Sequence, residues 1–319
     1  MQKLHLGAAQ CALDLGDGSE RAEYVNQDYI LHKLGRPHRA IGIMYTYYPH
    51  DKQWPQRISK ACKDMNITFQ WDYPYDDYFP FNADGQPWEQ MRDIRRHGQD
   101  AALTLTLDCS LSDDELREVA RMLRPYGRMT IRINHECSGT WFTHNKRFTY
   151  EQVGKFFAHF SDIIHQEAPN VRTVFCAGFA QADGKLEKED EFAVAYRAAD
   201  VWSADCYLAL HYGWPYDVAE VGGGQYKTDS VGMYYDLFRR TYERASSQFG
   251  AKPLVTAEFN TDGDVTGPRH QGESVIRFAE AFRDHQADWF KAISLYQFRD
   301  RGRLGLEIED PNNPAVGIE

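Results

Sequence analysis

The feature that most constrains the fold is an alternation of strand-like and helix-like segments along most of the 319 residues. Short runs rich in apolar and β-branched residues favour strands, and longer amphipathic runs between them favour helices. The expected strands are 4–10, 39–47, 67–71, 129–134, 171–177, 201–207, a strand that includes Glu258, and 292–298. The expected helices are 24–34, 54–65, 88–97, 111–123, 150–166, 191–198, 231–249 and 273–288. This order predicts parallel strands joined by right-handed helical crossovers.

An α/β chain of this length with eight such strands predicts a (β/α)8 TIM barrel, which needs about 250 residues or more. No internal repeat, low-complexity tract or boundary divides the chain, so residues 1–319 are expected to form a single domain. Ala101 to Asp108 also alternates leucine and threonine, and counting it would give nine strands. We therefore interpret it as an extra piece in the connection between strands three and four. The proline-containing tail, Gly302 to Glu319, suggests that a regular last helix is lacking.

Charge and composition exclude several classes of partner. The net charge of −11 would repel a nucleic acid backbone, and no run of about 18 apolar residues could span a membrane. The N-terminus lacks the pattern of a signal peptide, so the chain is expected to be cytoplasmic, or secreted if an export signal has been removed. The six cysteines contain no CxxC pair, which argues against a zinc site and a disulfide framework. We expect a monomer.

Two glutamates stand where parallel strands end. Glu136 follows the strand 129–134, and Glu258 closes the sequence Thr256-Ala257-Glu258. In a closed barrel both strand ends lie on one face, so the two carboxylates are expected to approach each other. Such a pair can cleave a glycosidic bond, with retention if they lie about 5 Å apart and with inversion if the gap is nearer 8 Å. The alternative for either glutamate is an ion pair with a basic neighbour.

Further residues are candidates for substrate binding. Arg132 alternates to the same side of its strand as Glu136, where a guanidinium could keep a carboxylate ionised. Aromatic residues are abundant, at 14%, and flat rings can stack on the C–H faces of sugars or simply fill a core. The candidates for stacking or binding sugar are Trp71, Trp141, Trp202, Trp214 and Tyr296. Arg299, with Arg301 and Arg303, follows the last strand and could meet an anionic or decorated glycan.

The sequence around the two glutamates resembles glycoside hydrolase family 26, in clan A of the retaining barrel glycosidases. The matching residues are Arg132, His135-Glu136, Gly139 and Trp141, together with Lys252-Pro253, Thr256 to Phe259, Trp202 and Tyr207. The resemblance follows the order of elements over residues 1–300 and is specific only near Glu136 and Glu258. Cys137-Ser138 departs from the Met-Asn that the family commonly has after the acid/base.

The resemblance implies a role for each of these residues. Glu136 would be the acid/base and Glu258 the nucleophile, while Arg132 and His135 would hold the carboxylates and Tyr207 would hydrogen-bond the nucleophile. It also implies a β-linked oligo- or polysaccharide as substrate, most commonly β-mannan and otherwise mixed-linkage glucan or xylan. No metal and no organic cofactor are expected.

Two other functions fit the same residues. One is a metal-dependent barrel hydrolase or isomerase with His135, Glu136, His211 and Glu258 as ligands, although no His-x-His or His-x-x-x-His pair supports it. The other is a glycan-binding barrel without turnover, against which the presence of both acids argues.

Overall fold

The structure is a computed structural model of the chain. It describes residues 3–6, 9–16, 24–35, 37–50, 79–81, 89–139, 144, 147–212, 225–261, 268–296, 298 and 306.

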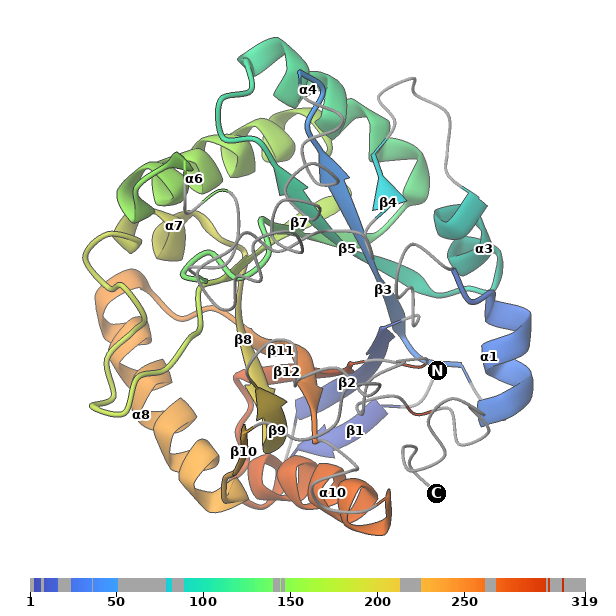
Figure 1. Cartoon of the computed structure of the whole chain (residues 1–319), viewed down its shortest axis with the longest axis vertical. Coiled ribbons are helices and arrows are strands. Elements are labelled where there is room, and N and C mark those ends of the chain that lie inside the picture. The colour runs from blue at the N-terminus through green and yellow to red at the C-terminus, as the bar shows by residue number, and fades with distance from the viewer. Residues whose placement is uncertain are drawn as a thin grey trace.

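Eight parallel strands form a closed barrel at the centre of the molecule (Figure 1). They are β2 (Ala9–Gly16), β3 (Ala40–Tyr47), β5 (Asp100–Leu107), β6 (Met129–Ile133), β7 (Val171–Cys176), β8 (Val201–Tyr207), β11 (Leu254–Asn260) and β12 (Phe290–Leu295). The ring closes because β2 pairs in parallel with β12 on one side and with β3 on the other. The structure therefore confirms the (β/α)8 barrel.

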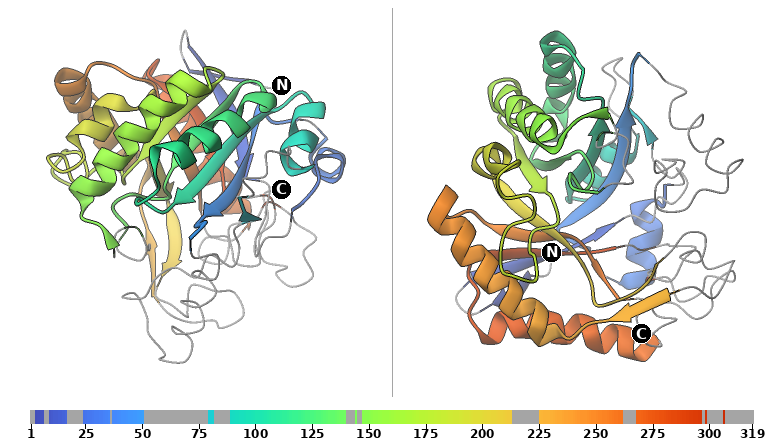
Figure 2. Two further views of the ribbon diagram at one scale, coloured as in Figure 1. Left: turned by 90° about the horizontal axis from the view of Figure 1, so that it is seen from above. Right: turned by 60° about the vertical axis from the view of Figure 1, so that its left-hand side comes forward.

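Helices surround the barrel, and Figure 2 shows them packed along its outer side. They are α1 (Gln27–Leu34), α3 (Glu89–Arg96), α4 (Asp113–Met122), α6 (Tyr150–Glu167), α7 (Ala193–Ala198), α8 (Val231–Phe249) and α10 (Pro268–Asp284), with a 3-10 turn, η2 (Arg124–Tyr126). Smaller strands are β1 (Lys3–Leu6), antiparallel to β2, the short β4 (Phe79–Pro80) beside β3, and a hairpin of β9 (Ala209–Tyr212) and β10 (Gln225–Thr228). Among the described residues, no helix is long and apolar enough to cross a membrane.

The interpretation of Ala101 to Asp108 as an extra piece is wrong. This segment is β5, which pairs along its whole length with β3 and continues the ring to β6. Its leucines and threonines alternate because both of its faces are buried, with Leu103 and Leu105 in the hydrophobic core and Thr104 in contact with Arg132. The expected helix 54–65 and strand 67–71 lie outside the described residues. So does most of the tail in which a last helix was expected to be lacking.

The first barrel strand also differs from the expected segment 4–10. The chain forms two strands there, and the later one, β2, belongs to the barrel while β1 pairs with it antiparallel. The other predicted elements that fall within the described residues are present to within a few residues, whereas β4, β9 and β10 were not predicted. A capping box begins α4, because the Ser112 side chain accepts from the Glu115 N–H and the Glu115 carboxylate accepts from the Ser112 N–H.

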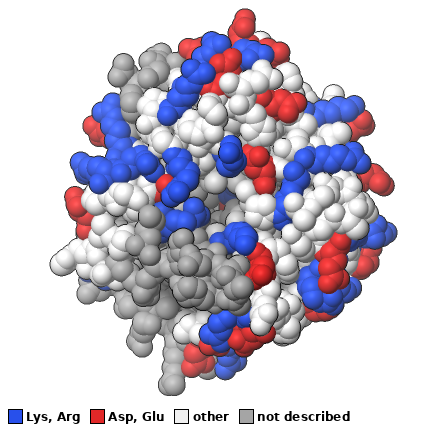
Figure 3. Space-filling view, turned by 180° about the vertical axis from the view of Figure 1, so that it is seen from behind, with Lys and Arg blue, Asp and Glu red and all other residues white. Residues whose placement is uncertain are grey.

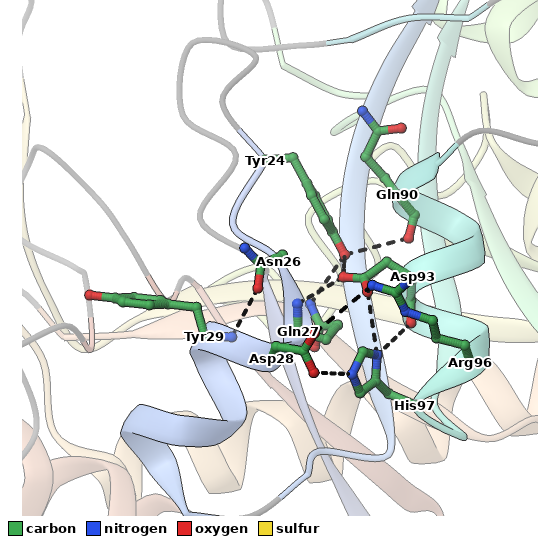
Figure 4. Close-up of polar contacts among 9 residues, drawn as sticks. All are labelled: Tyr24, Asn26, Gln27, Asp28, Tyr29, Gln90, Asp93, Arg96 and His97. Atoms are coloured by element: carbon green, nitrogen blue, oxygen red, sulfur yellow. Dashed lines mark hydrogen bonds and ion pairs between the residues drawn. The ribbon is translucent and has the colours of Figure 1, made fainter.

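A polar cluster joins α1 to α3 (Figure 4). The carboxylate of Asp93 is buried and accepts from the Tyr24 hydroxyl and from the backbone N–H of Gln27, each at 2.8 Å. The His97 ring lies between the Asp93 carbonyl oxygen, at 2.7 Å, and the Asp28 carboxylate, at 2.8 Å. These bonds hold two helices that are far apart in sequence against the same side of the barrel.

Candidate active site

Glu258 faces the interior of the barrel because of an irregularity in β11. Val255 pairs with Ser203 of β8 and Thr256 with Ala204, but the next pair is Glu258 with Asp205, so Ala257 is an extra residue. Successive side chains of a strand point to opposite faces, and one extra residue reverses the faces of all that follow. Phe259 consequently faces outward and stacks on Phe278 of α10, with ring centroids 4.1 Å apart. Without this bulge, Glu258 would face the helices.

The bulge has its own support within the barrel. The backbone N–H of Ala257 has moved off the strand ladder, and the buried hydroxyl of Ser203 accepts a hydrogen bond from it at 3.0 Å. This bond satisfies a polar group that would be costly to bury alone.

Glu136 lies on a tight turn that begins where β6 ends. Asn134 and Glu136 both have positive φ angles, of 60° and 43°, in the left-handed region that side chains other than glycine rarely adopt. The turn directs the partly exposed Glu136 toward the end of the barrel formed by the carboxyl ends of the strands, which we call the mouth.

Arg132 is buried among acidic residues inside the barrel. It donates through Nη1 to Asp205 Oδ2 at 3.0 Å, through Nη2 to Glu258 Oε1, and through Nε to the Thr104 hydroxyl at 3.0 Å. The structure thus places Arg132 against the carboxylate expected to act as nucleophile. A planar guanidinium with several fixed donors suits this position, because it holds two carboxylates at once.

Two other residues singled out in the sequence contact Glu258. His135 Nε2 lies 2.6 Å from Glu258 Oε1, and the Tyr207 hydroxyl donates to Glu258 Oε2 at 2.9 Å. Tyr296, which follows β12, packs edge-on against the Tyr207 ring with centroids 6.2 Å apart. Both oxygens of Glu258 are therefore held in place, one from the end of β6 and the other from β8.

Asp205 is a site residue that the sequence analysis missed. It lies on β8 between Ala204 and Cys206, pairs with Arg132, and shares a hydrogen bond with Glu136. One signal could have revealed it. Asp205 is the one charged residue of β8, two residues before Tyr207 and so on the same face of the strand.

The two glutamates meet across the mouth. Among the described residues, His135, Glu136, Asp205 and Glu258 each present a ligand atom within 4.8 Å of the others. A carboxylate oxygen of Glu136 therefore lies within 4.8 Å of one of Glu258, despite their separation in sequence.

The surroundings shift the pKa values of the two glutamates in opposite directions. Burial, together with the negative charges of Asp205 and Glu258, raises the pKa of Glu136 well above its usual range. Burial alone would raise the pKa of Glu258, but its contacts with His135 and Arg132 outweigh burial and hold that pKa well below the usual range. Burial also lowers the pKa of His135, so Arg132 is the permanent positive charge beside Glu258 at neutral pH.

Asp205 couples the two glutamates. Burial and the charge of Glu258 raise the pKa of Asp205 to about 7, while Arg132 opposes this rise. The shared hydrogen bond raises the pKa of Glu136 and lowers that of Asp205, so Glu136 carries the proton in it and Asp205 accepts. The arrangement keeps one glutamate protonated and the other ionised, as an acid and a nucleophile require.

The expectation that Trp202 stacks on sugar is corrected. Trp202 is 0% exposed, and its indole N–H donates to the Tyr196 carbonyl oxygen of α7 at 2.9 Å. It faces the surrounding helices because it lies three residues before Asp205 on β8, on the opposite side of the strand. Trp71, Trp141, Trp214 and Arg299 lie outside the described residues, as does the side chain of His211.

The four clustered side chains also offer the donor set of a metal site, with three carboxylates and one imidazole. Arg132, however, already contacts two of those carboxylates. Its guanidinium would repel a divalent cation placed between them.

No protein-family model and no curated protein matches this sequence. Solved structures do resemble it. The modular endo-β-1,4-mannanase of Cellulomonas fimi, from glycoside hydrolase family 26, aligns over 94% of this chain and 68% of its own, at 12% identity and a TM-score of 0.55.

Two further structures align nearly as well. The family 26 β-mannanase BoMan26A of Bacteroides ovatus aligns over 90% of this chain and 80% of its own, at 9% identity and a TM-score of 0.50. ZgEngAGH5_4, solved with cellotriose, aligns over 98% and 93%, at 9% identity and a TM-score of 0.50. At such identities the likeness concerns the fold alone. This chain therefore has the barrel fold of the family 26 mannanases, in agreement with the resemblance noted in its sequence.

Proposed function

We propose that the protein is a retaining glycoside hydrolase that cleaves β-linked glycans, with β-mannan as the first candidate and β-glucan or xylan as the others. The observation that carries this proposal is the approach of Glu136 and Glu258 to within 4.8 Å at the barrel mouth. Retaining enzymes hold their two carboxyl groups about 5 Å apart, whereas inverting enzymes need a wider gap for water. The fold shared with the Cellulomonas fimi and Bacteroides ovatus mannanases supports the choice of substrate class.

The reaction follows from the protonation of the two glutamates. Ionised Glu258, held by Arg132 and Tyr207, attacks the anomeric carbon while Glu136 gives its proton to the leaving oxygen. A covalent glycosyl-enzyme forms. Water then attacks its anomeric carbon, and Glu136, now a carboxylate, takes a proton from that water. Bond cleavage thus occurs with two inversions, and the configuration of the product is that of the substrate.

The first test is activity on panels of mannan, mixed-linkage glucan and xylan, with the anomeric configuration of fresh product followed by NMR. Glu258→Ala should keep its fold by circular dichroism and lose turnover by several orders of magnitude, because no nucleophile remains. Product of inverted configuration, or near-wild-type turnover by Glu258→Ala, would disprove the mechanism. Binding of a glycan without released sugar would favour a binding barrel instead.

A metal-dependent hydrolase or isomerase is a second candidate, favoured by the cluster of His135, Glu136, Asp205 and Glu258. It predicts that activity is lost on treatment with EDTA and restored by a divalent cation. The glycosidase proposal predicts the same rate before and after chelation, since Arg132 already supplies the positive charge.

A further inference from the structure

The turn that carries Glu136 is strained at two positions. Asn134 and Glu136 both adopt positive φ, which is unfavourable for a residue with a Cβ. Asparagine tolerates this region better than most residues, whereas glutamate has no such preference. A conformation of this kind persists only when the surrounding structure holds it in place.

The side chain of Asn134 ties one end of the turn to β5. The amide is buried, with 1% of the residue exposed, and its Oδ1 accepts from the backbone N–H of Leu107 at 2.8 Å. The last backbone pair between β5 and β6 is Leu105 with Ile133, after which the backbone turns away. The Asn134 amide therefore continues the hydrogen bonding of the two strands beyond that point. Its Nδ2 also donates to Cys109 Sγ at 3.4 Å.

The other end of the turn is tied to β7. The N–H of Cys137 donates to the Cys176 carbonyl oxygen at 2.9 Å, and the N–H of Gly139 donates to the Glu136 carbonyl oxygen at 2.7 Å. Cys137 is fully buried, and its thiol points back to the Ile133 carbonyl oxygen at 3.6 Å. The backbone of Glu136 is thus held between β5 and β7, the two strands that flank β6.

From this geometry we propose that Asn134 is a positioning residue for the acid/base Glu136. Its amide, bonded to Leu107, fixes the left-handed turn that places the Glu136 carboxyl against Asp205 and across from Glu258. The inference rests on the proposed function and assigns to Asn134 a role that acts only through Glu136. Asn134 itself touches neither Glu258 nor Arg132 among its described contacts.

The test compares Asn134→Ala and Asn134→Gly with the wild type on phenyl and 2,4-dinitrophenyl β-glycosides of mannobiose, cellobiose and xylobiose. Dinitrophenolate leaves without a proton, whereas phenolate needs general acid catalysis, which contributes about 10²- to 10⁴-fold. For both variants we expect kcat/KM on the phenyl glycoside to fall about tenfold more than on the dinitrophenyl glycoside. The basic limb of the pH profile should also move to lower pH, since Glu136 loses its place beside Asp205, whose charge raises its pKa.

The glycine variant separates the effect of the backbone conformation from that of the side-chain amide. Glycine adopts φ near 60° without strain but has no amide to bond to Leu107. It also keeps the test valid if Asn134→Ala fails to fold. Ser161→Ala is the matched control, since it removes a buried 2.8 Å hydrogen bond to Thr173 on the outer side of the barrel. It should lower stability and leave the ratio of the two substrates unchanged.

Glu136→Ala distinguishes this inference from the proposed function. If Glu136→Ala shows strong dependence on the leaving group but Asn134→Gly behaves like the wild type, the positioning role is wrong and the function stands. If Glu136→Ala itself shows no such dependence, the assignment of the acid/base is wrong and the proposed function fails with it.

Discussion

At the scale of single residues, Arg132 separates the roles of the three carboxyl groups at the mouth. Its guanidinium contacts Glu258 and Asp205 but not Glu136 among the described contacts, so its charge stabilises the ionised forms of the first two most directly. Glu136 instead shares a proton with Asp205. Without Arg132, three carboxyl groups this close would compete for protons, and none would be consistently ionised or protonated.

Asp205→Asn should change the pH dependence of turnover. The charge of Asp205 raises the pKa of Glu136, so its removal should lower that pKa and move the basic limb of kcat/KM to lower pH. The acidic limb reports Glu258, whose pKa stays low because Arg132 remains. Profiles of kcat/KM against pH for the two proteins measure the shift. A basic limb that stays in place or moves to higher pH would contradict the coupling.

The residues that sequence could supply are those with a local pattern. Glu136 and Glu258 stand near strand ends, and Arg132 alternates to the side of Glu136, so these three could be named from the pattern. His135 and Tyr207 were named through the resemblance to family 26. Trp202 was misplaced because an aromatic residue on a strand gives no sign of which face looks inward. Asp205 was missed because its partners, Arg132 and Glu136, come from β6, and only the closed barrel brings β6 and β8 within contact.

At the scale of elements, the irregularity in β11 decides whether the site exists. The bulge at Ala257 turns Glu258 inward, and the Ser203 hydroxyl satisfies the displaced N–H. The sequence could not predict it, since one extra residue leaves the run from Leu254 to Asn260 looking like any strand. The role of β5 was missed for a related reason, because its pairing with β3, and not a local pattern, puts Ala101 to Leu107 in the barrel.

Ser203→Ala should impair turnover through this bulge. The Ala257 N–H would lose its partner in a buried place, at a cost of about 1–3 kcal/mol, and the orientation of Glu258 would loosen. We expect kcat/KM to fall about tenfold on phenyl and dinitrophenyl glycosides alike, because misplacing a reacting group slows both. Denaturant unfolding and steady-state kinetics measure the two effects. Ser161→Ala, with a similar loss of stability, should keep full activity, and equal activity in both variants would refute the role of Ser203.

The contact between α1 and α3 should make stability depend on pH (Figure 4). Hydrogen bonds to the Asp93 carbonyl and to Asp28 raise the pKa of His97 above its usual value. The stabilisation is therefore fully present below about pH 6.5, the value in an unfolded chain, and is lost as pH rises through the folded value. His97→Gln should lower the urea midpoint at pH 5.5 and change it little at pH 9.

Asp28→Asn and the double variant complete a cycle for this contact. If His97 acts through Asp28, the losses of stability in His97→Gln and Asp28→Asn at pH 5.5 should add up to more than the loss in the double variant. If the loss of stability caused by His97→Gln became larger at higher pH, the His97 ring would not be charged in this contact.

At the scale of the whole molecule, the two ends of the barrel differ in charge and in the roles we assign to them. The acidic cluster lies at the carboxyl ends of the strands, whereas arginines gather at the opposite end. There Arg39, Arg95 and Arg128 lie 3.7, 2.8 and 2.7 Å from the carboxylate of Asp100, which is 4% exposed. Figure 3 looks onto this end and shows many Lys and Arg side chains around its centre, although the chain as a whole has a charge of −11.

Asp100→Asn should therefore affect stability without affecting catalysis. Removing the carboxylate leaves three arginines facing one another, and we expect a loss of about 1–3 kcal/mol because their exposed heads are partly screened by solvent. Glu167→Gln, which removes a more exposed carboxylate from another group of three arginines, should cost less. Urea unfolding measures both. A fall in kcat/KM of Asp100→Asn at a temperature where it is fully folded would contradict this separation.

The extra residue in β11 bears on how this protein is compared and redesigned. An alignment that starts at Leu254 and matches residues one by one without a gap would set Ala257, and not Glu258, against the corresponding acid of a relative whose strand is regular. Removing Ala257 would place Glu258 directly after Thr256 and opposite Asp205, so a shortened, regular strand would still point Glu258 into the barrel. Pairing Ala257 with Asp205 in a strand of unchanged length would instead turn Glu258 to face α10.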